Sequence, residues 1–371
     1  MSVELDPSAL PERQLSRPIE EIARETAVDP RIPAEVPGFD APFFQAGLAG
    51  FSDAAMRLLA RKHGAPYCLT EALLDRFLLG LEAKPSDDRR EDPNYLEEFL
   101  GEARAHDHPI AGQVMGTEPD EMAAAAARLV ELGYDTIDVN FACPVKKISR
   151  KNRGGHFLAA PFEAKQVLAA VRAAVPEGTS TSVKLRRGFD ESDEAAFSFE
   201  TIFDAAYELG YSWATVHCRT VEQKYKGPGR WEALRELTER YPDRVIFGSG
   251  DIWRVEDIFA MLELTGVHAV SVARGAIGNP WIFRDARTLM AGDAPRAPSL
   301  LEQSEVLLEH VELSVALYGE WLAPRFMRKF AQKFSLLHPN GADVRRALVG
   351  CKTIEEWRAA IELHYPISPA E

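Results

Sequence analysis

The chain has 371 residues, of which 46% are hydrophobic, which is enough for a sizeable core and for one or two domains. Its 57 acidic residues outnumber 43 lysines and arginines and give a formal net charge of −14. Over the whole chain, this charge argues against nucleic acid or an anionic membrane as a partner. We find no signal segment and no apolar run long enough to span a bilayer, so we expect a cytoplasmic protein without membrane contact.

Four cysteines are present, and none belongs to a CxxC pair, which argues against a structural zinc site and leads us to expect no metal. Residues 1–38 are rich in proline, glutamate and arginine. We interpret them as an N-terminal extension that is either disordered or carries one short helix at Ile19–Thr26.

From Pro42 onward, short apolar runs alternate with longer stretches of helical period. The expected strands are Phe43–Gly47, Tyr67–Ala72, Ile110–Met115, Thr136–Phe141, Thr181–Arg186, Trp213–Cys218, Val245–Gly250 and Ala269–Arg274. The clearest helices between them are Ser52–His63, Pro119–Leu132, Pro161–Val175, Ser198–Leu209 and Val255–Leu264. Eight such units predict an α/β fold, a (β/α)8 TIM barrel over residues 39–292, with an open doubly wound sheet as the alternative.

After Trp281 the strand pattern stops, and a proline-containing link at Gly292–Ser299 leads into a stretch with only helical periodicity. The apolar spacing between Leu300 and Leu337 predicts a small helix bundle. We therefore expect an all-helical domain at residues 293–371.

The active site of a barrel lies at the C-terminal ends of its strands. The last two strands end in glycine-rich segments, Gly248–Asp251 and Ala273–Trp281. Backbone N–H groups at such ends can bind a phosphate, and Arg274 could add a charged hydrogen bond. Glycines that only turn the chain are the alternative interpretation.

Lys184 and His217 end neighbouring strands and should face the same barrel mouth. A cation beside a flavin would stabilise the reduced ring, and Gln113 could hydrogen bond to its imide edge. Cys143 lies in the turn after the fourth strand, where a thiol could protonate a carbanion or attack an electrophile. A satisfied core histidine and a small buried thiol are the alternatives for His217 and Cys143.

Five segments together carry a family resemblance: Asp138–Lys147, Val183–Asp190, Thr215–Thr220, Gly248–Asp251 and Ala273–Phe283. From about Ala41 to Phe283 the chain resembles the flavin-dependent tRNA-dihydrouridine synthases. The region beyond it is similar in length and character to the helical RNA-binding domain of that family.

The resemblance implies FMN at the barrel mouth, NADPH as reductant, hydride transfer to C6 of a uracil in tRNA, and a proton from Cys143 to C5. We find no nicotinamide fingerprint in the sequence, so NADPH rests on the resemblance alone. The matching motifs imply these cofactor-binding residues: Gly47, Leu48, Ala49, Gln113, Asn140, Lys184, His217, Ser249, Gly250, Asp251, Ala273 and Arg274. Arg186 would meet the substrate or the flavin. Such an enzyme must take the uracil out of its stack to reach it.

The sequence departs from the family pattern at four points. Ala142 stands before the cysteine where glycine is usual, Ala46–Gly50 reads AGLAG where APMAG is common, and Ser249 and Ala273 replace asparagine and glycine. Each change keeps a small or hydrogen-bonding residue, so we expect flavin binding to survive. The target could be another tRNA position or ribosomal RNA.

An RNA partner requires local positive charge. Residues Cys143–Arg187 contain ten lysines and arginines against two acids, and residues Pro324–Lys352 contain seven against one. Solvated charged faces are the alternative to an RNA track. The basic residues expected to contact RNA are Lys146, Lys147, Arg186, Arg325, Arg328 and Lys329.

The sequence therefore predicts a monomeric tRNA-dihydrouridine synthase that uses FMN and NADPH. One alternative is a flavin barrel reductase that acts on a free pyrimidine or enone. Another is a non-catalytic RNA-binding protein that keeps the fold.

Overall fold

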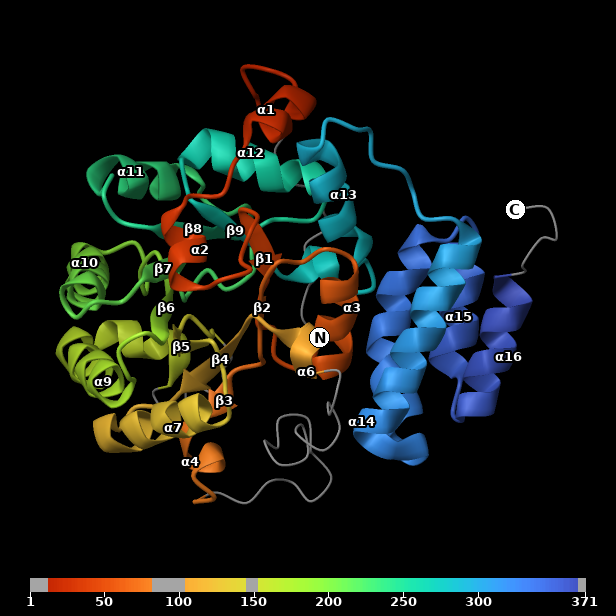
Figure 1. The fold of residues 1–371 in the computed structure, drawn as a ribbon, viewed down its shortest axis with the longest axis horizontal. Helices are drawn as coiled ribbons and strands as arrows, with labels where there is room; N and C mark the ends of the chain where they lie inside the picture. The colour runs from red at the N-terminus through yellow and green to blue at the C-terminus, as the bar shows by residue number, and fades with distance from the viewer. Residues whose placement is uncertain (1–12, 82–103, 145–152, 366–371) are drawn as a thin grey trace.

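The computed structural model describes residues 13–81, 104–144 and 153–365. Nine parallel strand segments form one sheet in the order β2-β1-β9-β8-β7-β6-β5-β4-β3. They are β1 (Phe43–Gln45), β2 (Cys68–Leu69), β3 (Leu73–Leu74), β4 (Ile110–Met115), β5 (Thr136–Phe141), β6 (Ser180–Arg186), β7 (Trp213–His217), β8 (Ile246–Ser249) and β9 (Ala269–Val272). Since β2 pairs with both β1 and β4, the sheet closes. The predicted α/β TIM barrel is confirmed (Figure 1).

One expected strand, Tyr67–Ala72, is interrupted. Its place is taken by β2 and β3, which both pair with β4. Between them, the backbone N–H of Gln113 donates to the hydroxyl of Thr70 at 2.9 Å, where a regular ladder would use a backbone carbonyl. Nine segments therefore fill eight positions of the barrel.

Helices cover the outside of the barrel, as Figure 1 shows. They include α3 (Ala54–Lys62), α7 (Pro119–Glu131), α9 (Pro161–Ala174), α10 (Asp193–Glu208), α11 (Glu232–Arg240), α12 (Val255–Thr265) and α13 (Trp281–Met290), with short α4 (Asp75–Leu78) and α6 (Arg104–Asp107). Proline opens α7 and α9, as expected at a first helical position. Helix α10 begins five residues before the predicted Ser198, because the Ser192 side chain caps it.

The N-terminal segment covers the end of the barrel opposite the strand C-termini. Helix α1 (Ile19–Glu25) packs on α12 and α13, so the expected short helix is present and residues 13–38 are folded. After α2 (Arg31–Glu35), Phe39 stacks on Tyr67 with ring centroids 4.6 Å apart, and Trp213 stacks on Phe247 at 5.0 Å. This aromatic floor forms a core of its own with Ile32 and Val36.

The C-terminal part is helical, as predicted, and contains α14 (Leu300–Phe334), η5 (Ser335–Leu337), α15 (Gly341–Gly350) and α16 (Ile354–His364). Ser299 and Glu302 form a capping box at the start of α14. Gly319, with a φ of 72°, divides α14 into two helical pieces. This helical domain stands beside the barrel, and α14 contacts α3 (Figure 1). In the described part of the chain, no helix is both long and apolar enough to cross a membrane.

Candidate active site

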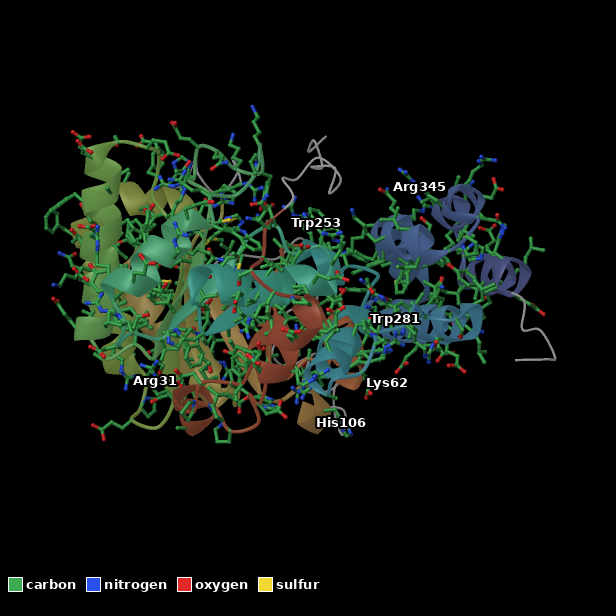
Figure 2. The ribbon with its side chains drawn as sticks, turned by 90° about the horizontal axis from the view of Figure 1, so that it is seen from above. Arg31, Lys62, His106, Trp253, Trp281 and Arg345 are labelled. Carbon is green, nitrogen blue, oxygen red and sulfur yellow. The ribbon has the colours of Figure 1, made fainter. Side chains whose placement is uncertain are left out.

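The strand register brings the predicted polar side chains to one end of the barrel. Gln113 pairs with Asp138, Asn140 with Lys184, Arg186 with His217, and His217 with Ser249. In Figure 2, Trp253, which follows the C-terminal end of β8, and Arg31 lie on opposite sides of the barrel. The barrel mouth is therefore on the side of Trp253, opposite the aromatic floor.

A buried hydrogen-bond chain leads from the barrel interior to the cysteine turn. Asp138 accepts from Ser182 Oγ at 2.6 Å and from Gln113 Nε2 at 2.7 Å. Gln113 Oε1 in turn accepts from Asn140 Nδ2 at 2.6 Å. Because each amide uses both of its ends, the chain defines which way round Gln113 and Asn140 face.

Asn140 shapes the turn that carries Cys143. Its Oδ1 accepts from the backbone N–H groups of Ala142 and Cys143 at 3.0 and 3.1 Å. The carbonyl of Cys143 accepts from the N–H of Gly155 at 2.9 Å. A Cβ on Gly154, whose φ is +63°, would lie 3.0 Å from the Cys143 Cβ. Cys143 is half-buried, and hydrogen bonds to its backbone fix the turn that carries the thiol.

Arg186 organises loops around the mouth. Its guanidinium donates to the carbonyls of Ala142 at 2.8 Å, Thr220 at 2.8 Å and Lys224 at 2.9 Å. The side chain is 2% exposed, and burial lowers its pKa to about 10. These contacts connect the cysteine turn to the loop after β7. Arg186 therefore stabilises the position of the cysteine turn.

Lys184 differs from its charged neighbours. It is 8% exposed, and within the described residues no side chain or carbonyl forms a hydrogen bond or ion pair with its ammonium. Burial lowers its pKa, while Asp138 opposes that effect. A largely buried lysine whose ammonium lacks a hydrogen-bond partner among the described residues fits a site that takes an anionic or carbonyl-rich ligand.

His217 is neutral at physiological pH. Burial, followed by the charge of Arg186, lowers its pKa well below the ordinary value. Its Nδ1 accepts from the N–H of Arg219 at 3.1 Å, so the proton of the neutral ring lies on Nε2. The ring can thus act as a hydrogen-bond donor.

The glycine-rich end of β8 forms a tight buried turn. Gly250 has a φ of +126° and Asp251 one of 59°, and a Cβ on Gly250 would lie 2.3 Å from Cys218 Sγ. Asp251 pairs with fully buried Arg219 at 2.6 Å and accepts from the N–H of Gly229 at 2.7 Å. Its carboxylate therefore stabilises the turn, and the backbone N–H groups of the turn are the groups that suit a phosphate.

Arg274, from the end of β9, lies beside that turn, as predicted. Its guanidinium is 3.7 Å from the Asp251 carboxylate and lies over the rings of Trp253 at 4.4 Å and Tyr225 at 5.1 Å. Ala273 precedes it in the same strand-end turn. These residues form the second half of the candidate phosphate site.

The end of β1 approaches the same region. A Cβ on Gly47 would lie 2.2 Å from the carbonyl of Thr70 and 3.3 Å from Gln113 Oε1, so the two loops touch through backbone. The next residue, Leu48, donates its N–H to Ser52 Oγ at 2.7 Å, and Ala49 is exposed at the loop surface.

Of the basic residues expected to contact RNA, Arg186 lies in β6, and Arg325, Arg328 and Lys329 lie in α14, where their side chains have different partners. Arg325 lies over the exposed ring of Trp321 at 3.8 Å. Arg328 donates to the carbonyl of Cys351 at 3.0 Å, and Lys329 donates to that of Gly50. Lys146 and Lys147 lie outside the described residues.

Three residues that shape the site are not among those that the sequence predicts. Asp138 and Ser182 each lie two positions before a predicted site residue, so the period of a strand could have placed them on the same face. Tyr318, from α14, binds Asp53 in the β1 loop, and nothing in the local sequence marks it.

Comparison with known proteins identifies the family. A sequence model described as dihydrouridine synthase (Dus) matches residues 44–366. The chain belongs to the dihydrouridine synthase family. This confirms the resemblance carried by the motifs from Asp138–Lys147 to Ala273–Phe283.

Two curated relatives of this dihydrouridine synthase family member illustrate the likeness. The chain is 33% identical over 258 residues to a probable tRNA-dihydrouridine synthase of Mycobacterium tuberculosis (strain ATCC 25618 / H37Rv), covering 68% of this chain and 65% of that protein. It is 32% identical over 286 residues to tRNA-dihydrouridine synthase B of Shewanella oneidensis, covering 76% and 83%. The match thus spans less than two thirds of the mycobacterial protein.

A solved structure supports the barrel architecture. Histamine dehydrogenase from Rhizobium sp. 4-9 superposes with a TM-score of 0.52 at 12% identity, covering 80% of this dihydrouridine synthase family member and 51% of that chain. At this identity the likeness concerns the fold alone.

Proposed function

We propose that this protein is an FMN-dependent tRNA-dihydrouridine synthase, which reduces the C5=C6 bond of uridines in tRNA with NADPH as reductant. The observation that carries the proposal is that largely buried Lys184, whose ammonium has no hydrogen bond or ion pair among the described residues, lies at the same barrel mouth as half-buried Cys143. In this proposal, residues 39–292 form the catalytic barrel and residues 293–371 the RNA-binding domain.

The residues at the mouth fit a flavin mononucleotide. Lys184 and His217 would meet the polar edge of the ring, with Gln113 beside them, and Gly47, Leu48 and Ala49 would lie under it. The backbone from Ser249 to Asp251, with Ala273 and Arg274, would hold the phosphate. A bound FMN supplies hydride-transfer chemistry.

The chain's own groups then perform three tasks. With FMN bound, Lys184 would place a positive charge, and neutral His217 an Nε2–H donor, against the polar edge of the flavin ring. Cys143 donates its thiol proton to C5 of the uracil as hydride arrives at C6, which saturates the bond and leaves a thiolate to be reprotonated. Asn140 and Arg186 hold the turn that presents this thiol.

Local positive charge and one exposed cation–π pair support an RNA substrate. The net charge of −14 describes the whole chain, whereas residues Pro324–Lys352 are basic. In that stretch Arg325 lies over exposed Trp321, and such a pair suits an unpaired base and its phosphate.

The decisive experiment maps dihydrouridine in RNA by mass spectrometry, with and without the gene. We expect defined uridines of tRNA to lose the modification in the deletion strain and to regain it from purified protein, FMN and NADPH. Loss confined to ribosomal RNA would reassign the substrate, and an unchanged map would refute the proposal.

The small-molecule alternative is tested with the same protein. After reduction by NADPH, we expect the flavin to be reoxidised much faster by tRNA than by free uracil. Equal rates would favour a reductase of small pyrimidines.

A further inference from the structure

The loop between β1 and α3, residues Leu48–Asp53, is held by the helical domain. Tyr318 Oη donates to Asp53 Oδ2 at 2.6 Å, and the ammonium of Lys329 donates to the carbonyl of Gly50. Between these contacts, Phe51 meets Phe330 edge to face, with ring centroids 5.6 Å apart. All three contacts come from the single helix α14, on both sides of its kink.

Asp53 is the most buried of the loop residues that contact α14. It is 1% exposed, and its Oδ1 caps α3 by accepting from the N–H of Met56 at 3.0 Å while Oδ2 accepts from Tyr318. Tyr318 is itself 9% exposed. A buried carboxylate that loses one of its donors costs more than an exposed one, so this contact strongly restricts where the loop can lie.

Contacts within the loop connect the position of Asp53 to the barrel mouth. Ser52 Oγ accepts from the N–H of Leu48 at 2.7 Å, which links the end of the loop to its beginning. The preceding residue, Gly47, packs so closely on Thr70 that a Cβ there would be 2.2 Å from the carbonyl oxygen, with Gln113 next to it. A shift at Asp53 therefore changes the surface on which a flavin would rest.

We infer that the helical domain is part of the cofactor site, and that Tyr318 and Lys329 are positioning residues that hold the loop Leu48–Asp53 under the flavin ring. This inference rests on the proposed function. It assigns α14 a role in the barrel chemistry besides that of carrying the surface for RNA.

The test compares Tyr318→Phe with Tyr211→Phe in the full-length protein. Tyr211 is also buried, at 3% exposed, and its hydroxyl donates to the carbonyl of Leu168 at 3.0 Å, among residues outside the loop Leu48–Asp53. FMN affinity, the visible flavin spectrum, kcat and the KM for tRNA are measured for both.

For Tyr318→Phe we expect the FMN dissociation constant to rise about fivefold, the effect of losing one partner of a buried hydrogen bond. The flavin absorption band should shift and kcat should fall, while the KM for tRNA stays unchanged. Tyr211→Phe should retain the wild-type spectrum. Wild-type flavin affinity and spectrum in Tyr318→Phe would overturn the inference, whereas wild-type protein that binds no FMN would refute the proposed function itself.

A second pair of variants covers the case in which Tyr318→Phe fails to fold. Lys329→Met removes the donor to Gly50, and Lys62→Met removes a 2.6 Å contact to Glu309 that joins α3 and α14 without touching the loop. The same flavin changes are expected for Lys329→Met alone. Equal spectra in both variants would overturn the inference.

Discussion

Nε2 of Gln113 donates a hydrogen bond of 2.7 Å to Oδ2 of Asp138, and both side chains are 1% exposed. Because Ser182 Oγ donates to the other carboxylate oxygen at 2.6 Å, Asp138 acts as an acceptor on both sides. Gln113 must then turn Oε1 towards Asn140, the residue that shapes the turn of Cys143. Asp138 thus acts on the cysteine through two intermediates.

Replacing Asp138 by asparagine should loosen this chain. If the new amide oxygen still accepts from Gln113, its nitrogen faces Ser182, whose hydroxyl must then accept and loses its own buried acceptor, at a cost of about 1–3 kcal/mol in the free energy of unfolding. Urea unfolding measures that loss, and the alkylation rate of Cys143 reports the displaced turn. Exposed Asp343→Asn is the control, with an effect within about 0.5 kcal/mol. Equal stability and alkylation in the two variants would contradict the chain.

Removing the thiol alone should separate chemistry from binding. The contacts to Asn140 and Gly155 use only the backbone of Cys143, so Cys143→Ala should keep the loop and the bound flavin. Loss of a general acid lowers turnover by about 10²–10⁴-fold, measured as dihydrouridine formed in tRNA. Cys351→Ala, at a buried position in the helical domain, should retain activity. Wild-type turnover by Cys143→Ala would reject the proton-donor role.

The buried imidazole of His310 should make stability depend on pH. Burial lowers its pKa from 6.5 to about 4, with Asp53 opposing and Lys329 reinforcing the effect. As pH falls below 6.5, the unfolded chain takes up the proton first, so folded-state stability decreases, by about 2 kcal/mol at pH 5.

The variant His310→Leu should lack this contribution and also remove two ring nitrogens that have no partner in the described residues. Chemical unfolding at pH 7 and pH 5 should show a smaller loss for His310→Leu than for wild type. The exposed His106→Gln should behave like wild type. Identical losses in wild type and His310→Leu would show that His310 does not titrate as argued.

Replacing two cations of α14, Arg325 and Lys329, should have different effects on the salt dependence of tRNA binding. If Arg325 contacts one phosphate, Arg325→Gln should reduce the slope of log affinity for tRNA against log salt by about 0.7–0.9. Lys329→Gln should leave that slope unchanged, because its ammonium binds the carbonyl of Gly50. Filter binding over a series of KCl concentrations measures both. A flat salt response of wild type would argue against an electrostatic RNA surface.

Much of the barrel could be predicted because its signals are local. Strands β4 to β9 coincide within two residues with apolar runs, and proline or serine marks the start of several helices. The break between β2 and β3 could not be predicted, because it depends on Thr70 meeting Gln113 from a neighbouring strand. A single sequence contains no register between strands.

In the candidate site, too, features with a local signal could be predicted and contacts between distant residues could not. Its strand-end residues were predicted by position, whereas the contact between Tyr318 and Asp53 joins residues 265 apart and leaves no local pattern. The basic stretch Pro324–Lys352 predicts an RNA contact for Lys329. The charge of a lysine does not show whether its ammonium faces solvent or, like that of Lys329, binds a carbonyl of the neighbouring domain.

The aromatic floor has a consequence for truncation of the gene. A protein started at residue 39 would lose Ile32 and Val36, which pack with Phe39 beneath the barrel. Water would then reach the rings of Tyr67, Trp213 and Phe247 from below. Such a shortened protein should express poorly or aggregate, although the residues at its mouth would all be intact.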